Sequence, residues 1–256
     1  MKLFFLLTLV SFNLFAQVEL LKTADQKNYN PRIRGITDLV VDVESKKLEE
    51  KVNEMKNFGH VKKLVLRFYW TAQPERMAIE IIGLPEGFKE IKEELKQGVA
   101  KLFEDVIPVS LEKRFSSFEL SKKSAKSIIA KDKNNAAPIP SYELIFDSND
   151  LLQQVVAHRP VGEMVVNYVY ERTAFSDGKW VNKAQETIIK EAGQQVSIRK
   201  EINFQTVAGM GFPGIVQITT RHSSPKGNQE TTEEYVFSNY SINKGDAVKY
   251  FLSEGK

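Results

Sequence analysis

Residues 61–81 of the 256-residue chain read VKKLVLRFYWTAQPERMAIEI, and this stretch decides the fold. On both sides of a turn at Thr71–Pro74, apolar side chains recur at every second position, which is the period of a β-strand. The stretch therefore predicts an antiparallel hairpin with one very apolar face. The side chains expected on that face are Leu64, Leu66, Phe68, Trp70, Met77, Ile79 and Ile81.

The strongest helix pattern of the chain follows the hairpin, from about Glu86 to Val106. Its apolar side chains recur at steps of three and four residues, and charged side chains cover the rest of its surface. Such a stripe must lie on an apolar surface, and the hairpin face is the nearest candidate. The side chains of the stripe are Phe88, Ile91, Leu95, Val99 and Leu102.

The remaining pattern is mostly that of strands. Gly35–Val43 reads as a first strand, and Ser45 can cap a helix directly after it. From Tyr142 onward the alternation predicts consecutive antiparallel strands, of which Val196–Thr206 is the clearest. Only Asp150–His158 is ambiguous between a strand and a short helix. The predicted fold class is α+β, mostly antiparallel β: a half-closed β-barrel with amphipathic helices covering its apolar face.

Two segments have the composition of loops. Residues 17–34 are polar and rich in turn formers, and residues 121–140 are rich in Lys, Ser, Asn and Pro. The overlapping segment 113–133 carries seven positive and two negative residues. It favours either a solvated loop or a docking patch for an anionic lipid or an acidic partner.

The first 16 residues have the pattern of an export signal. Lys2 precedes the uncharged, mostly apolar stretch Leu3–Phe15, and Ala16 marks the expected cut. The alternative is a retained N-terminal anchor. The chain has no cysteine, which excludes disulfides and a lipid attached at the cut. We therefore expect a periplasmic protein with a single domain over 17–256 and a helix and loop insertion at about 85–140.

Composition and motifs argue against an enzyme or a nucleic-acid partner. The net charge of +3 is too small to imply nucleic-acid binding. The three histidines are scattered, so no metal site is expected, and no G-x-S-x-G motif marks a hydrolase nucleophile. Gly209–Gly214 matches G-x-G-x-x-G, but Pro213 and the β-rich residues after it predict a turn between strands. We expect no catalytic residue and no cofactor, with an exported hydrolase as the weakest alternative.

The hairpin from Phe68 to Ile81, an aromatic strand followed by a proline turn and a second strand, resembles one in the LolA-like superfamily of outer-membrane lipoprotein carriers. Further similarities lie at Val207–Gly209, Pro213, Ile215, Phe237–Asn243 and Phe251. The resemblance implies an incomplete antiparallel barrel, closed on one side by helices, that encloses an apolar cavity for acyl chains. The carriers proper hold an arginine at the position of Gln73, so the resemblance supports lipid binding more than lipoprotein transfer.

Two functions follow as hypotheses. The first is a periplasmic, monomeric carrier or binding protein for lipid or lipoprotein acyl chains, with envelope membrane proteins as further candidate partners. Its cavity wall would be the hairpin face named above, and its lid Phe88, Ile91, Leu95 and Leu102. The alternative is a non-enzymatic structural or interaction module of the envelope, with a packed barrel and the Lys-rich segment 113–133 as its contact. The sequence does not separate a lined cavity from a filled core, because both need an inward apolar stripe.

Overall fold

The computed structural model describes residues 18–54, 61–134, 137–191, 194–224 and 227–253. The strands are β1 Asp38–Glu44, β2 Val65–Ala72, β3 Glu75–Ile82, β4 Phe118–Ser124, β5 Ser127–Asp132, β6 Ser141–Phe146, β7 Leu152–His158, β8 Glu163–Arg172, β9 Trp180–Glu191, β10 Gln194–Val207, β11 Met210–Ser224 and β12 Gly227–Ile242. The labelled helices are η1 Pro31–Arg34, α2 Lys46–Glu54, α3 Lys89–Val99, η2 Ala100–Leu102, α4 Phe103–Val106, α5 Leu111–Arg114, η3 Ala174–Ser176 and α6 Asp246–Ser253, and another helix covers residues 18–27.

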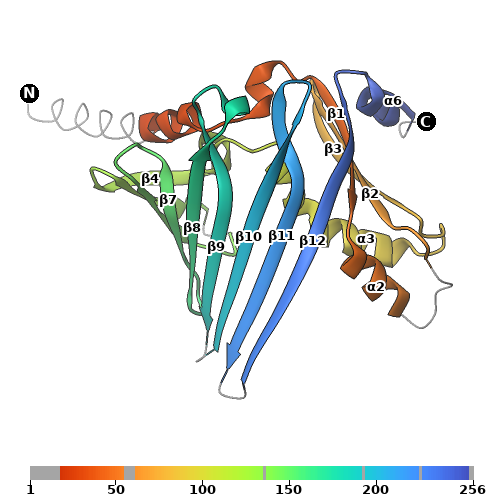
Figure 1. The fold of residues 1–256 in the computed structure, drawn as a ribbon. Coiled ribbons are helices and arrows are strands. Elements are labelled where there is room, and N and C mark those ends of the chain that lie inside the picture. Colours follow the sequence, from red (N-terminus) through yellow and green to blue (C-terminus); the bar gives the residue numbers. More distant parts are fainter. Residues whose placement is uncertain (1–17, 55–60, 135–136, 192–193, 225–226, 254–256) are drawn as a thin grey trace, which may run out of the picture. The chain divides into compact units, whose positions relative to one another are not determined.

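Within these ranges the strands belong to one open, mostly antiparallel sheet. Its hydrogen-bonded order is β3-β2-β1-β12-β11-β10-β9-β8-β7-β6-β5-β4 (Figure 1). From β4 to β12 the neighbours follow the order of the chain, as expected for strands joined by short turns. The predicted class of mostly antiparallel β-structure with a few helices is therefore confirmed.

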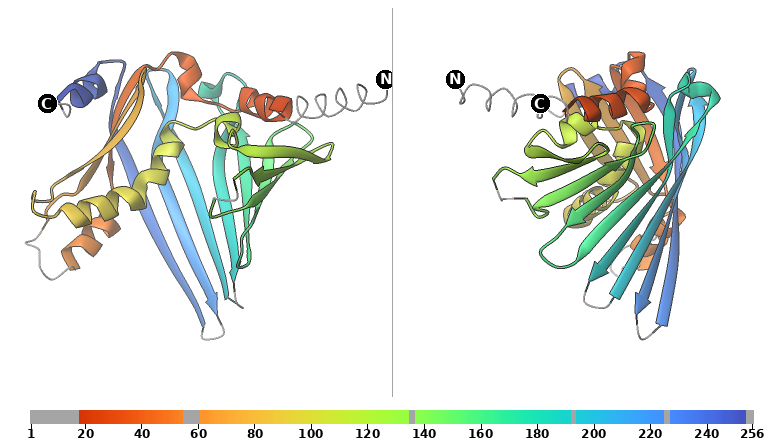
Figure 2. Two further views of the ribbon diagram at one scale, coloured as in Figure 1. Left: turned by 180° about the vertical axis from the view of Figure 1, so that it is seen from behind. Right: turned by 90° about the vertical axis from the view of Figure 1, so that its left-hand side faces the viewer.

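Contacts divide the chain into two compact units. The β4–β9 unit comprises the described residues up to Tyr29 and those within Val109–Glu201 and Thr219–Thr231. The β1–β3 unit comprises the described residues within Asn30–Pro108 and Ile202–Ile218 and those from Thr232 to Ser253. In Figure 2 the orange and yellow segments belong to the β1–β3 unit, and the green strands belong to the β4–β9 unit. Each unit has its own apolar cluster of buried side chains.

The predicted hairpin of the β1–β3 unit is confirmed. Strands β2 and β3 pair antiparallel, so that Phe68 lies opposite Ile79 and Leu66 opposite Ile81. Helix α2 begins one residue after Ser45, whose hydroxyl accepts a hydrogen bond from the Leu48 backbone N–H at 3.4 Å. The predicted cap is thus the observed one.

The expected helix over Glu86–Val106 is present in a shorter and segmented form. It begins at Lys89 and runs as α3, a 3₁₀ turn (η2) and α4. Helix α3 lies against β3. The ambiguous segment Asp150–His158 contains strand β7 and no helix.

Two predicted loops are wrong. Most of residues 121–140 belong to the β4–β5 hairpin, in which Ile128 and Ala130 are fully buried. The four lysines of that hairpin masked the alternation of β5, since their charges made the whole segment look solvated. Residues 18–27 form a helix and not a turn-rich stretch, because Leu21 and Ala24 lie three residues apart and are both buried.

The G-x-G-x-x-G match forms the predicted turn only at its first residue, because Gly209 lies in the turn whereas residues 210–214 already belong to strand β11. Ala208 and Gly209 both have positive φ, 49° and 75°, and join β10 directly to β11. The predicted export signal and one of the three histidines, His60, lie outside the described residues.

Candidate functional site

The predicted cavity wall is packed. Leu66, Phe68 and Trp70 are 1%, 0% and 2% exposed, and Leu64, Ile79 and Ile81 are also buried. Side chains that water does not reach line no open cavity in this conformation. These six residues instead belong to a filled cluster.

Met77 differs from the other predicted wall residues. It lies opposite Trp70 in the hairpin but is 52% exposed. The alternation places it on the predicted face, and the turn end of β3 leaves it at the margin of the cluster. Met77 is therefore not part of the buried core.

The predicted lid contacts this cluster. Leu95 and Leu102 are buried in it, and Ile91 is partly buried against it. Phe88 is half-buried at the N-terminal end of α3. The helix stripe and the strand face thus meet in the β1–β3 unit.

The apolar stripe extends beyond the predicted lid. Phe103 packs edge to face on Phe68, with ring centroids 5.4 Å apart. Val106 and Ile107 are 0% and 1% exposed in the same cluster. Val106 lies four residues beyond Leu102, so the three- and four-residue spacing already contained this signal.

The opposite face of the same strands is polar, because successive side chains of a strand point to opposite sides. On it Arg67 of β2 binds Asp42 of β1 through two atoms, with Nε to Oδ1 at 2.6 Å and Nη2 to Oδ2 at 3.0 Å. Asn239 of β12 donates a third hydrogen bond to Asp42 Oδ2 at 3.0 Å. Burial alone raises the pKa of Asp42, but the hydrogen bonds from Arg67 and Asn239 outweigh it and lower that pKa.

A local irregularity brings Asn239 to this position. The β1–β12 register shifts between Val40 and Asp42, and Asn239 has a φ of 53° on β12. An extra residue in one strand re-aims its side chains, and asparagine tolerates the left-handed conformation better than most residues. The irregularity therefore supplies the third partner of the Asp42 carboxylate.

Helix α6 lies against β1 and β2 on this face, where Ala247 is buried in a small apolar cluster with Val40 and Tyr69. Tyr250 stacks on Tyr69 with ring centroids 3.8 Å apart and an angle of 11°. Burial and the hydrogen bond to Glu80 raise the pKa of Tyr69 to about 12. Helix α6 begins at Asp246, directly after Gly245. The Gly245 N–H donates a hydrogen bond to Asp38 Oδ2 at 2.9 Å, which ties the start of the helix to β1.

A shallow pocket of about 610 Å³ lies between α6 and the polar face of β1, β2 and β12. Sequence reasoning missed both the pocket and α6. The spacing of Ala247, Tyr250 and Phe251 carries the helical signal. The pocket itself has no such signal, since it depends on where α6 packs. Its lining residues are Val40, Asp42, Arg67, Tyr69, Asn239, Ser241, Asp246, Lys249, Tyr250 and Ser253.

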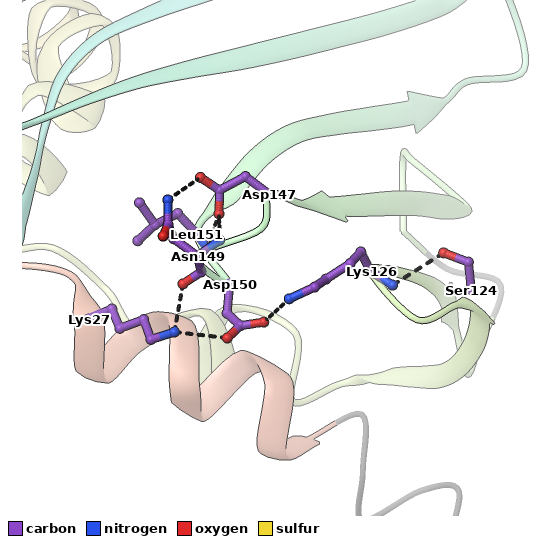
Figure 3. Close-up of polar contacts among 7 residues, drawn as sticks. All are labelled: Lys27, Ser124, Lys126, Asp147, Asn149, Asp150 and Leu151. Atoms are coloured by element: carbon purple, nitrogen blue, oxygen red, sulfur yellow. Dashed lines mark hydrogen bonds and ion pairs between the residues drawn. The ribbon is translucent and has the colours of Figure 1, made fainter.

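The Lys-rich segment of the β4–β9 unit is partly neutralised by neighbouring carboxylates. Asp150 lies between Lys27 and Lys126 and forms an ion pair with each, at 2.8 Å to Lys27 (Figure 3). Lys123 likewise pairs with Glu143 at 2.8 Å. Hydrogen bonds from these lysines lower the pKa of both carboxyl groups. Two of the seven positive charges expected to form a docking patch, Lys123 and Lys126, are thus paired with carboxylates.

Among the described residues, no group of His, Asp and Glu side chains has the arrangement of a metal site. Over the same ranges no helix is long and apolar enough to cross a membrane. Comparison with protein-family models, with curated proteins and with solved structures finds no match.

Proposed function

We propose that the chain is a periplasmic, non-enzymatic binding protein or carrier for lipid or lipoprotein acyl chains. In this proposal the sheet is a half-closed barrel, the hairpin face is its inner wall, and α3, η2 and α4 are the lid. The observation that carries it is the shared cluster of the β1–β3 unit, in which an amphipathic helical segment lies directly on the hairpin's most apolar side chains. The export pattern of residues 1–16 and the resemblance of the hairpin to the lipoprotein carriers support the location and the cargo class.

The packed core fits a carrier without cargo. An acyl chain and the lid stripe offer the same kind of surface, so the lid side chains Leu95, Leu102 and Phe103 would occupy the space that the cargo takes. Each buried CH₂ group contributes roughly 0.8 kcal/mol, so about 15 methylenes contribute on the order of 12 kcal/mol at most. Displacing the lid costs part of that free energy, which lowers the net affinity and permits release.

The lid is tested by Leu95→Glu in the full chain. A charge at this buried position opposes packing of α3 on the hairpin, so we expect greater binding of a fluorescent fatty-acid probe than in the unchanged protein. Leu252→Glu is the matched control, because Leu252 is 67% exposed on α6. The control is expected to leave binding unchanged.

Two results would refute the lid. In the first, Leu95→Glu changes neither probe binding nor the free energy of unfolding, which means that the helix covers no apolar surface. In the second, probe binding rises but an excess of unlabelled phospholipid or lipopeptide does not displace the probe, which means that the apolar face does not accept acyl chains.

A second function, an interaction module of the envelope, is favoured by the filled core and by strand β4. This strand ends the sheet order, and its side chain Lys122 is exposed. Charge reversal of Lys122 should abolish capture of an envelope partner and leave acyl-chain content unchanged. If the charge-reversed variant kept its acyl chains and still captured the partner, this function would be excluded.

A further inference from the structure

We propose that the pocket beneath α6 binds a neutral, polyhydroxylated ligand, namely a mono- or disaccharide unit of a glycan. This site lies on the polar face of β1, β2 and β12, while the proposed acyl-chain site lies on the apolar face of the same strands. The inference therefore does not rest on the proposed function. Either site can fail its test without the other.

The volume and the surroundings of the pocket suit a small organic ligand. About 610 Å³ lies within the usual range of small-molecule sites, roughly 300–1,000 Å³. The aromatic pair Tyr69 and Tyr250 forms part of the lining and supplies the apolar surface that sites for such ligands combine with a few fixed polar groups.

The charges of the lining balance and are already paired. Arg67 holds Asp42 through two hydrogen bonds, and Lys249 lies 3.3 Å from Asp246. An anionic ligand would face two carboxylates, and a cationic ligand would face the guanidinium and the ammonium. Either would have to compete with an ion pair that the protein has made. Fixed charge in the pocket therefore selects against ions of both signs.

Hydroxyl groups fit this lining because each donates one hydrogen bond and accepts others. The Asp42 and Asp246 carboxylates have lone pairs beyond those used by their partners, and the Lys249 ammonium has N–H groups beyond the one facing Asp246. A ligand with several neighbouring hydroxyls satisfies such a mixed set without breaking either pair. Sugars are the common biological ligands with this property.

The floor of the pocket is preorganised for binding. Asp42 is 7% exposed and is fixed by side chains from β2 and β12, whereas the Arg67 side chain is 37% exposed and reaches the pocket. Ser241 donates to Asp246 at 2.6 Å, which fixes the second carboxylate at the start of α6. Groups held in this way lose little conformational freedom when a ligand binds.

The test is calorimetric titration of the full chain with three neutral probes, cellobiose, maltose and N,N′-diacetylchitobiose, and with glucuronic acid and glucosamine as charged probes. We expect at least one neutral disaccharide to bind with a dissociation constant on the order of 1 mM, and the charged probes to bind about tenfold more weakly or not at all. Ser253→Trp, which places a bulky ring in the pocket, should abolish binding. Leu252→Trp changes the neighbouring exposed residue outside the lining and should preserve it.

Lys249→Ala serves as a second variant, because its exposed side chain has no part in the core. Loss of one hydrogen-bonding group predicts about twofold to tenfold weaker binding. The proposal is overturned if no neutral disaccharide binds, if the charged probes bind as tightly as the neutral ones, or if binding is unaffected by both Ser253→Trp and Lys249→Ala.

Discussion

The two faces of strands β1 and β2 differ in how closely their side chains are packed. On one face Phe68 and Trp70 are packed into a cluster that excludes water. On the other face Arg67 and Tyr69, their immediate neighbours in the chain, line an open pocket. The face with the pattern expected of a binding cavity is filled, and the face that looked like ordinary polar surface is hollowed.

The physical reason lies in the side chains. Apolar groups attract one another without directional preference and close over any gap, which gives protein interiors the density of organic crystals. Planar charged groups such as the Arg67 guanidinium hold their partners at fixed distances and angles, so space remains between them and α6. Alternation in one strand can therefore produce a packed core and a polar pocket.

The largest effect is expected on the packed face. Phe68→Ala removes a fully buried ring and its contact with Phe103, and should lower the free energy of unfolding by about 3–5 kcal/mol in urea titrations. Val169→Ala, at a 53% exposed position, is the control and should cost about 0.5 kcal/mol or less. If the two variants were equally stable, the cluster would not be the packed core of the β1–β3 unit.

The Asp42–Arg67 pair should show the next largest effect. Asp42→Ala leaves the Arg67 guanidinium without its acceptor and should cost about 1.5–3 kcal/mol, because the guanidinium is partly exposed and water replaces some of the loss. Glu44→Ala on the same strand breaks an exposed pair with Lys63 and should cost less than about 1 kcal/mol. If both substitutions lowered the free energy of unfolding equally, the Asp42–Arg67 pair would stabilise the fold no more than an exposed ion pair does.

The same pair predicts a dependence on pH. The folded state lowers the pKa of Asp42, so its stabilising contribution is complete above the pKa of an unfolded Asp, about 4, and is lost as the pH falls through the lower folded value. The stability difference between the unchanged protein and Asp42→Asn should therefore be constant near neutral pH and shrink below about pH 4. A difference that stayed constant down to pH 2 would contradict the lowered pKa.

The smallest effect is expected at the aromatic stack over the pocket. Tyr250→Leu keeps an apolar side chain on α6 but removes the ring that stacks on Tyr69, and should cost about 0.5–1.5 kcal/mol. Leu252→Ala, on the exposed side of the helix, should change the free energy of unfolding by about 0.5 kcal/mol or less. A null result for Tyr250→Leu would mean that α6 is not held by its aromatic contact.

Local periodicity predicted what depends on one segment alone. The alternation around Phe68 gave the hairpin and its apolar face, and the spacing of Leu95, Val99 and Leu102 gave the helix stripe that packs on it. Both signals are strong because most of the apolar side chains point the same way. The β5 strand shows the limit, since the lysines around Ile128 hid a buried alternation.

Contacts between segments that are distant along the chain could not be predicted from the sequence. Asp42 reads as an ordinary polar position in a strand, yet it is buried because Arg67 and Asn239 satisfy it. Asn239 is 197 residues away along the chain, and its side chain is re-aimed by an irregularity in pairing. No local sequence pattern predicts such a distant hydrogen-bond partner. The packed state of the hairpin face also depends on which side chains arrive from α3, η2 and α4.

The proposed binding of acyl chains by the apolar face is tested most directly by isolating the protein together with any ligand that it holds. The chain would be expressed with its N-terminal segment, purified from the periplasmic fraction, and analysed by native mass spectrometry beside an organic extraction. If the apolar face binds acyl chains, the spectrum will show a stoichiometric acyl-chain mass, or the protein will take up added phospholipid or lipopeptide. A clean mass for the protein alone, with no uptake of either lipid, would contradict acyl-chain binding and favour the packed interaction module.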